Sequence, residues 1–226
     1  MNRLFCEALG TFALVFAGTG AIVVDEISGG AISHPGVALC FGLVVMVMIY
    51  AVGDVSGAHL NPAVTFGFWL ARRLPGSDVL PYAASQVAGA LAASALVQAL
   101  FGSAGALGAT QPAGSSGQSL GLEIALTAML MFTILSVATG AKEKGITAGI
   151  AIGGAVGLGA LFGGPISGAS MNPARSLGPA LVGGELVALW IYLLAPLAGA
   201  ALAVLACRCA RGASCCAGAS QLSRLD

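Results

Sequence analysis

Six apolar stretches, each about as long as a membrane-spanning helix, constrain this chain more than any other feature of its sequence. A helix that crosses the hydrocarbon core of a bilayer needs about 20 mostly apolar residues. The stretches cover residues 4–24, 35–53, 79–101, 120–141, 145–162 and 186–207. Only 8% of the 226 residues are charged and the formal net charge is zero, which excludes a water-soluble globule and a nucleic-acid-binding surface. We therefore expect an all-α membrane protein with six transmembrane helices.

Two further apolar stretches, residues 61–71 and 172–182, are too short to cross the membrane. At a rise of about 1.5 Å per residue, each reaches about half of the hydrocarbon core. Each begins with Asn-Pro, and Asn is a favoured helix N-cap while Pro is a favoured first helical residue. Non-helical backbone at membrane depth is tolerated only where it is buried in protein or lines a water-filled cavity. The pattern predicts two re-entrant half-helices, and the apolar content disfavours the alternative of two surface loops.

One nine-residue pattern occurs twice in the chain. Val-Ser-Gly-Ala-His-Leu-Asn-Pro-Ala at 55–63 matches Ile-Ser-Gly-Ala-Ser-Met-Asn-Pro-Ala at 166–174, and Glu7, Thr11 and Phe16 have the spacing of Glu123, Thr127 and Phe132. Each copy holds three spans and a half-helix, and because three is odd the second copy must be inverted. We expect a first repeat over 1–110, a second over 111–207 and a tail over 208–226. Inverted repeats place a site near the bilayer midplane, where the repeats meet.

The basic residues indicate how the chain lies in the membrane. In a six-span arrangement all but one of them fall on the same side: Arg3, Arg72, Arg73, Lys142, Lys144, Arg208, Arg211 and Arg224. Because cytoplasmic loops carry an excess of Lys and Arg, we expect both termini to be cytoplasmic and the protein to be integral to the plasma membrane. Residues 102–118 then face outward, and we expect them to form an irregular loop.

The two Asn-Pro-Ala motifs carry the chemistry of the expected midplane site. They consist of Asn61, Pro62 and Ala63 in the first repeat and of Asn172, Pro173 and Ala174 in the second. The N-terminus of each half-helix carries a partial positive charge of about +0.5, which repels cations. Each Asn carboxamide can donate hydrogen bonds, and a water whose oxygen is held by two such donors cannot accept a proton from its neighbour. The motifs therefore favour passage of neutral polar molecules without protons.

Four other polar residues stand out in the apolar segments. Arg175 needs a water-filled cavity at membrane depth, so we expect it in the path near the outer mouth, while binding to loop carbonyls is the alternative. Glu7 and Glu123 suggest a proton relay by default, but their equivalent places favour a structural role, in which they accept N–H bonds from the segments before the half-helices. His59 can line the inner vestibule or bond to the loop backbone, and the sequence does not decide between these.

Two Asn-Pro-Ala motifs, the second followed by Arg, together with six spans and an inverted repeat, resemble the aquaporin family (major intrinsic proteins). The resemblance implies a homotetramer in which every protomer has its own pore. It also implies passive conduction of water and small uncharged solutes, without a cofactor or a catalytic residue.

The same resemblance identifies four residues with the constriction of that family: Phe41, Ala160, Ala169 and Arg175. Water-selective members typically carry His at the position of Ala160, so two alanines imply a wider opening. Glycerol facilitators typically carry Asp at the position of Ser176, and this chain departs from that pattern. Residues 164–180 look most like plant nodulin-like intrinsic proteins and their bacterial relatives, which conduct glycerol, urea or metalloid hydroxides such as arsenite.

Alternatives remain for the transport activity and for the tail. A water-dominated aquaporin is the nearest alternative, and an alternating-access transporter would also use inverted repeats and broken helices. No nucleophile–base pair or metal-ligand motif lies at the expected site, so we expect no enzyme. The thiols of the C-terminal region have three readings: a site for soft metals or arsenic, incidental residues of a solvated tail, or a lipidated juxtamembrane segment. They belong to Cys207, Cys209, Cys215 and Cys216.

Overall fold

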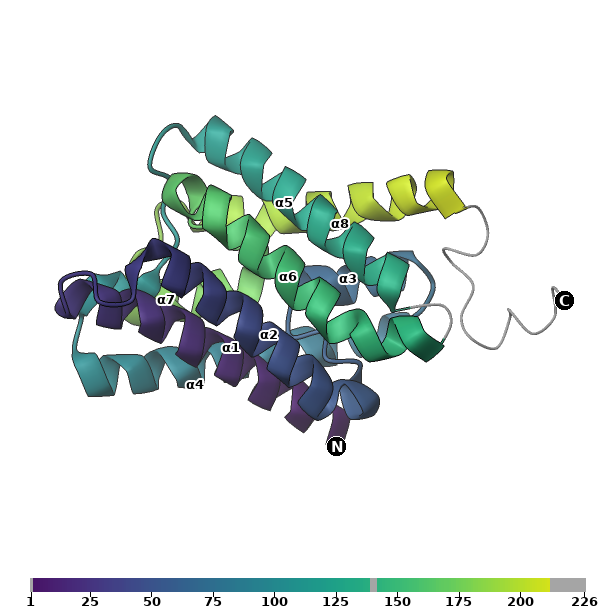
Figure 1. The fold of residues 1–226 in the computed structure, drawn as a ribbon, viewed down its shortest axis with the longest axis horizontal. Helices are drawn as coiled ribbons and strands as arrows, with labels where there is room; N and C mark the ends of the chain where they lie inside the picture. The colour runs from purple at the N-terminus through teal and green to yellow at the C-terminus, as the bar shows by residue number, and fades with distance from the viewer. Residues whose placement is uncertain (1, 139–141, 212–226) are drawn as a thin grey trace, which may run out of the picture.

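The computed structural model describes residues 2–138 and 142–211, and within these residues the regular structure is helical (Figure 1). The helices are α1 (Asn2–Ile27), α2 (Ser33–Ser56), α3 (Pro62–Leu70), α4 (Gly76–Phe101), the short 3₁₀ turn η1 (Ala104–Gly108), α5 (Ser116–Val137), α6 (Lys142–Ser167), α7 (Pro173–Gly183) and α8 (Leu189–Arg211). Six of them are long and apolar enough to cross a membrane, whereas α3 and α7 are not. The protein is therefore an all-α membrane protein, as the sequence predicts.

The helix ends differ from the expected ones by a few residues, for local reasons. The sequence places a span end at residue 162, but α6 continues through Pro165 to Ser167. Residues 61 and 71 are the caps of α3 rather than helical residues, and Asn61 accepts the N–H of Ala63 in the manner of an N-cap. Helix ends fray and are the least certain part of a sequence-based prediction.

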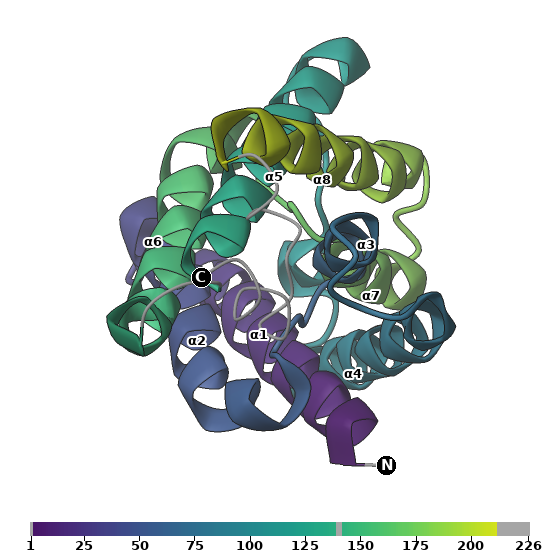
Figure 2. The same ribbon diagram turned by 90° about the vertical axis from the view of Figure 1, so that its right-hand side faces the viewer.

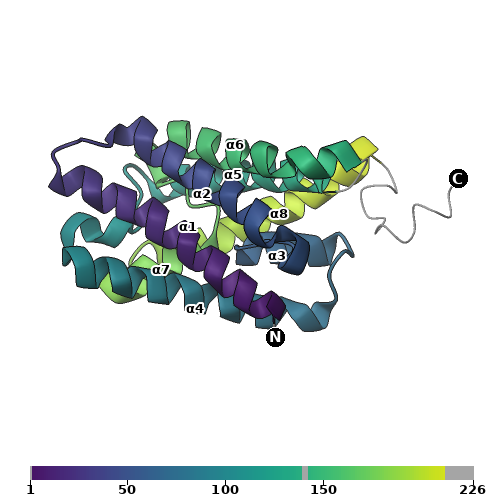
Figure 3. The same ribbon diagram turned by 60° about the horizontal axis from the view of Figure 1, so that its bottom comes forward.

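The two halves of the chain run in opposite directions. Figure 1 and Figure 3 show that α1 and α5 point toward opposite ends of the molecule, and that α3 and α7 enter from opposite ends. Figure 2 looks along the bundle and shows α3 and α7 one behind the other between α4 and α8, which both contact them. The beginning of α1 and the end of α8 lie at the same end, as an even number of crossings requires.

Glycines allow the long helices to approach closely at equivalent places. A Cβ on Gly89 in α4 would meet the backbone carbonyl of Ala8 in α1, and a Cβ on Gly199 in α8 would meet that of Ile124 in α5. Small residues at helix interfaces let backbones approach in membranes, where lipid removes the hydrophobic drive between helices. The outer faces instead carry large exposed apolar side chains, among them Leu39, Val47, Leu100, Ile150 and Leu205.

The connection between the halves is irregular, as expected, but part of it folds inward. Gly105, Ala106 and Leu107 have left-handed backbone angles within η1. Leu107 is only 1% exposed and packs with Val23 and Val97. This insertion brings the carbonyl of the next residue, Gly108, to the interior.

Candidate functional site: a pore between the half-helices

The segments before α3 and α7 have the same unusual backbone. Three residues in each have a left-handed φ: Gly57, Ala58 and Leu60 in the first, and Gly168, Ala169 and Met171 in the second. The φ values agree pair by pair. They are 87° and 81° for the two glycines, 46° and 41° for the two alanines, and 51° and 52° for Leu60 and Met171. Such a backbone cannot continue a helix, so its N–H groups need other partners.

Two buried carboxylates supply those partners. Glu7 accepts the N–H groups of His59 (2.9 Å) and Leu60 (2.7 Å), together with the Ser56 hydroxyl and the Gln86 amide. The same carboxylate is fully buried and does not line the cavity described below. These backbone bonds are the ones that the sequence predicts for a structural role.

Glu123 repeats this arrangement in the second half. It accepts the N–H groups of Ser170 and Met171, each at 2.8 Å, and the hydroxyl of Ser167 at 2.8 Å. Ser56 and Ser167 were not singled out by the sequence reasoning. The sequence nevertheless indicates that they are equivalent, because both are the second residue of the repeated nine-residue pattern.

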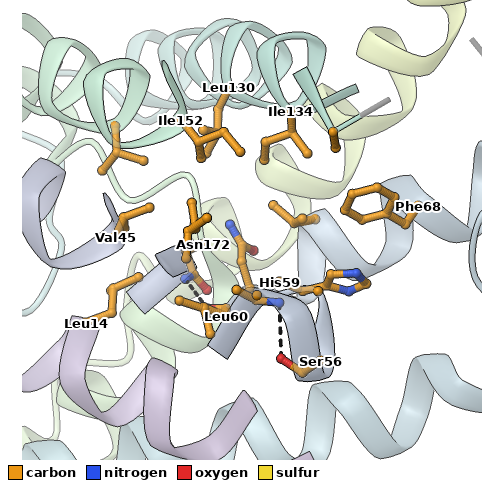
Figure 4. A pocket seen from close by; sticks show the side chains of 18 of the residues that line it. Leu14, Val45, Ser56, His59, Leu60, Phe68, Leu130, Ile134, Ile152 and Asn172 are labelled. Atoms are coloured by element: carbon orange, nitrogen blue, oxygen red, sulfur yellow. Dashed lines mark hydrogen bonds between the residues drawn. The ribbon is translucent and has the colours of Figure 1, made fainter. Parts of the chain in front are cut away.

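The two Asn-Pro-Ala motifs meet through reciprocal hydrogen bonds. Nδ2 of Asn61 donates to the Met171 carbonyl at 2.7 Å. Nδ2 of Asn172 donates to the Leu60 carbonyl at 2.9 Å (Figure 4). The Oδ1 atoms cap α3 and α7 by accepting backbone N–H groups. Because an amide nitrogen carries two hydrogens, each Asn keeps one donor for a molecule in the adjoining space.

A cavity of about 1080 Å³ runs past both Asn residues. At one end it is lined by Arg3, Asp54 and Arg72, and at the other it reaches Phe41 and Arg175. Apolar side chains from the long helices line much of the cavity, and Figure 4 shows Leu14, Val45, Leu130, Ile134 and Ile152 among them. The segment from Gly57 to Asn61 lines the same cavity.

The four residues of the expected constriction all line the far end of this cavity. The Cζ atom of Arg175 lies 5.0 Å from the centre of the Phe41 ring, a distance at which a cation and a ring attract. Ala160 and Ala169 are small and nearly buried, at 7% and 6% exposed. Nη1 of Arg175 donates to the Gly108 carbonyl at 2.7 Å, so this residue both lines the cavity and binds a loop carbonyl.

His59 lines the cavity and is held by side chains. Its ring stacks on Phe68, with 4.5 Å between ring centres, and its Nδ1 lies 3.1 Å from the Thr65 hydroxyl. The ring of Tyr82 also packs against the His59 ring, with 5.1 Å between ring centres. The polar partner of the His59 ring is thus a hydroxyl group rather than the loop backbone.

Ser176 lies behind the pore lining. It is fully buried, and its hydroxyl lies 2.8 Å from the Thr110 hydroxyl and 2.6 Å from that of Ser170. Glycerol facilitators typically have Asp at the position of Ser176. Because Ser176 does not line the cavity, this difference affects the packing around α7 rather than the cavity wall.

The four cysteines of the C-terminal region are only partly described. Cys207 is buried near the end of α8, and Cys209 is exposed with a free thiol. Cys215 and Cys216 lie outside the described residues. Among the side chains that the structure describes, no three from His, Cys, Asp or Glu come together as a metal site.

Gly18 in α1 packs against Phe41, one residue of the expected constriction, and this contact was not predicted from the sequence. A Cβ at Gly18 in α1 would overlap the ring of Phe41. The absence of a side chain thus lets the Phe41 ring lie back against α1. The signal was weak, because a glycine in an apolar helix is usual in membrane proteins.

Gly18→Ala is expected to push the Phe41 ring toward the cavity and to narrow the constriction. Glycerol permeability should fall by roughly fivefold, which corresponds to a barrier about 1 kcal/mol higher. Gly20→Ala is the matched control, since a Cβ at Gly20 meets nothing within 4 Å in the same helix. Light scattering on proteoliposomes measures both variants, and equal glycerol rates for the two would contradict this role.

Comparison with known proteins agrees with this geometry. Residues 1–207 match the profile of the major intrinsic protein family. The chain is 54% identical to aquaporin NIP1-4 of Oryza sativa subsp. japonica over 202 residues, which are 89% of this chain and 74% of that protein. It is 46% identical to nodulin-26 of Glycine max over 201 residues, which are 88% of this chain and 74% of that protein.

A solved structure has the same fold. The aquaglyceroporin from Plasmodium falciparum superposes with a TM-score of 0.79 at 26% identity, over 89% of this chain and 92% of that one. The sequence matches and this superposition support a transmembrane channel for water and small solutes rather than an enzyme. The chain belongs to the major intrinsic protein family.

Proposed function

We propose that this channel conducts glycerol, urea and neutral metalloid hydroxides such as arsenous and boric acid, in addition to water. The observation that carries the proposal is the pair of alanines, Ala160 and Ala169, which line the same cavity as Phe41 and Arg175. A methyl group at each position leaves room that a larger side chain would fill. The similarity to an aquaglyceroporin points in the same direction.

The proposed path excludes protons at the two Asn residues. Each Asn keeps one N–H donor beside the cavity, while its oxygen is occupied by the helix cap. A water that accepts both donors directs its own hydrogens away from the midpoint and breaks the chain of proton transfer. The positive N-terminal ends of α3 and α7 add repulsion toward cations.

An alternating-access carrier is less well supported by the same residues. Coupling to protons or sodium usually needs titratable groups along the path. Glu7 and Glu123 lie off the cavity and accept three or more hydrogen bonds each from the scaffold. We therefore assign them to holding the irregular segments.

Uptake into proteoliposomes tests the proposed solutes. Inward gradients of glycerol, urea and boric acid are applied to matched vesicles with and without the protein, and arsenite uptake is assayed on the same vesicles. We expect the protein to increase the rate of entry for each solute, with a linear dependence on the gradient. Water flow without entry of any of the four solutes would contradict the proposal.

We further propose a homotetramer in the plasma membrane, with both termini in the cytoplasm. Arg3, Arg72 and Arg73 contribute to the same end of the cavity, which fits the excess of basic residues on cytoplasmic loops. The first and second repeats, 1–110 and 111–207, would then each contribute half of every pore. Native mass spectrometry of the detergent-solubilised protein measures the number of chains, and a monomer alone would contradict the assembly.

A further inference from the structure

Pro165 leaves one carbonyl of α6 without its helical partner. A proline in a helix has no N–H, so the carbonyl four residues earlier loses its hydrogen bond. Here that carbonyl belongs to Leu161, and it lies one residue after Ala160 of the constriction. A backbone carbonyl at membrane depth needs another donor.

His34, at the beginning of α2, supplies this donor. Its Nε2 lies 2.6 Å from the Leu161 carbonyl oxygen. Because a carbonyl oxygen can only accept, Nε2 carries the hydrogen in either the neutral or the protonated ring. The ring also packs on Gly164, where a Cβ would come within 2.8 Å of the His34 Cε1 atom.

The hydrogen bond lies at the outer end of the interface between α2 and α6. Farther along the same interface, a Cβ on Gly42 of α2 would meet the Gly153 carbonyl of α6 at 2.8 Å. In sequence, Phe41 lies between His34 and Gly42, and Ala160 lies between Gly153 and Leu161. Phe41 and Ala160 therefore lie on segments of α2 and α6 that contact each other at both ends. The glycines form the contact at one end, and the His34 hydrogen bond forms it at the other.

We propose that His34 is a positioning residue, which sets the size limit of the constriction by holding α2 to the carbonyl that Pro165 leaves free. It touches no solute, since it is absent from the cavity lining. Without the bond, the outer end of α2 can move relative to α6, and the spacing between Phe41 and Ala160 becomes less well defined. The inference rests on the proposed conduction of polyols.

The first test compares the size limit of His34→Leu and His34→Gln. Glycerol and the larger polyol erythritol are measured on the same proteoliposomes, and the ratio of their permeabilities is the readout. We expect the erythritol-to-glycerol ratio to rise at least about threefold in His34→Leu. In His34→Gln, whose amide nitrogen can donate from a similar distance, we expect the wild-type ratio. An unchanged ratio in His34→Leu, or an equal rise in both variants, would overturn the proposal.

A second test uses the proline as the partner of the histidine. Pro165→Ala restores the helical N–H to the Leu161 carbonyl, so the donor from His34 becomes redundant for that atom. In the Pro165→Ala background, His34→Leu should then change the polyol ratio by less than half as much as it does alone. Additive effects of the two substitutions would contradict a shared acceptor.

Hydrogen exchange keeps this inference separate from the proposed solutes. If the wild-type protein conducts water but no glycerol, the proposed function is wrong. The effect of the His34 hydrogen bond on α2 can still be measured by hydrogen exchange of the α2 backbone amides. We expect faster exchange in the first turns of α2 for His34→Leu and wild-type exchange for His34→Gln. Equal exchange in all three proteins would overturn the positioning role independently of any flux.

Discussion

Ala160→His is expected to lower the glycerol permeability of this channel by at least about tenfold, while water permeability falls by less than about threefold. Ala160 and Ala169, which line the cavity together with Phe41 and Arg175, have only methyl side chains. An imidazole ring at position 160 would occupy the space through which we propose that a three-carbon polyol passes, whereas a single water would still fit. A tenfold change corresponds to a barrier that is about 1.4 kcal/mol higher.

Light scattering on proteoliposomes measures both permeabilities in one preparation. Ala160→Ser is the matched control, because its side chain is polar like histidine but only one atom larger than alanine. It should conduct glycerol within about twofold of the wild type. Equal loss of glycerol in the Ser and His variants would mean that polarity rather than width governs passage at this position.

Glu123→Leu is expected to destabilise the protein and to abolish water conduction. The substitution leaves the N–H groups of Ser170 and Met171 and the Ser167 hydroxyl without their acceptor in a buried site. Each unsatisfied donor costs roughly 1–3 kcal/mol, so three amount to roughly 3–9 kcal/mol. That is comparable with the whole stability of many proteins.

The thermal unfolding midpoint of the detergent-solubilised protein measures this effect. We expect Glu123→Leu to lower it by at least about 6 °C, and Glu123→Gln to lie between the Leu variant and the wild type because it keeps one acceptor oxygen. Glu26→Leu, at an exposed glutamate near the end of α1, should leave the midpoint unchanged. A wild-type midpoint for Glu123→Leu would contradict the assignment of Glu123 to the scaffold.

The pattern of the sequence determines the course of the chain through the membrane. Apolar length alone locates the six long helices, because a single segment of about 20 residues satisfies its own backbone groups in lipid only as a helix. The Asn-Pro pairs locate the beginnings of α3 and α7, since Asn caps a helix and Pro begins one. The equivalent positions of Glu7 and Glu123 indicate that they accept N–H groups from the segments before the half-helices, and the structure has such bonds.

Contacts between distant helices could not be predicted in the same way. The role of Gly18 depends on its contact with the Phe41 ring. The role of His34 depends on a hydrogen bond to a carbonyl 127 residues away in the chain. A glycine or a histidine in a membrane segment has many possible neighbours, and only the packed structure selects one. The inward fold of Leu107 also depends on a pocket formed by α1 and α4, which the local Gly- and Ala-rich sequence does not indicate.

One measurement tests the central claim most directly: glycerol entry and proton leak on the same proteoliposomes, loaded with a pH-sensitive dye. A hyperosmotic glycerol gradient is imposed together with a pH gradient across the membrane. The account predicts rapid shrinkage as water leaves, rapid reswelling as glycerol enters, and a change of internal pH no faster than in protein-free vesicles. Shrinkage without reswelling would contradict the wide constriction, and a rapid change of internal pH would contradict proton exclusion at Asn61 and Asn172.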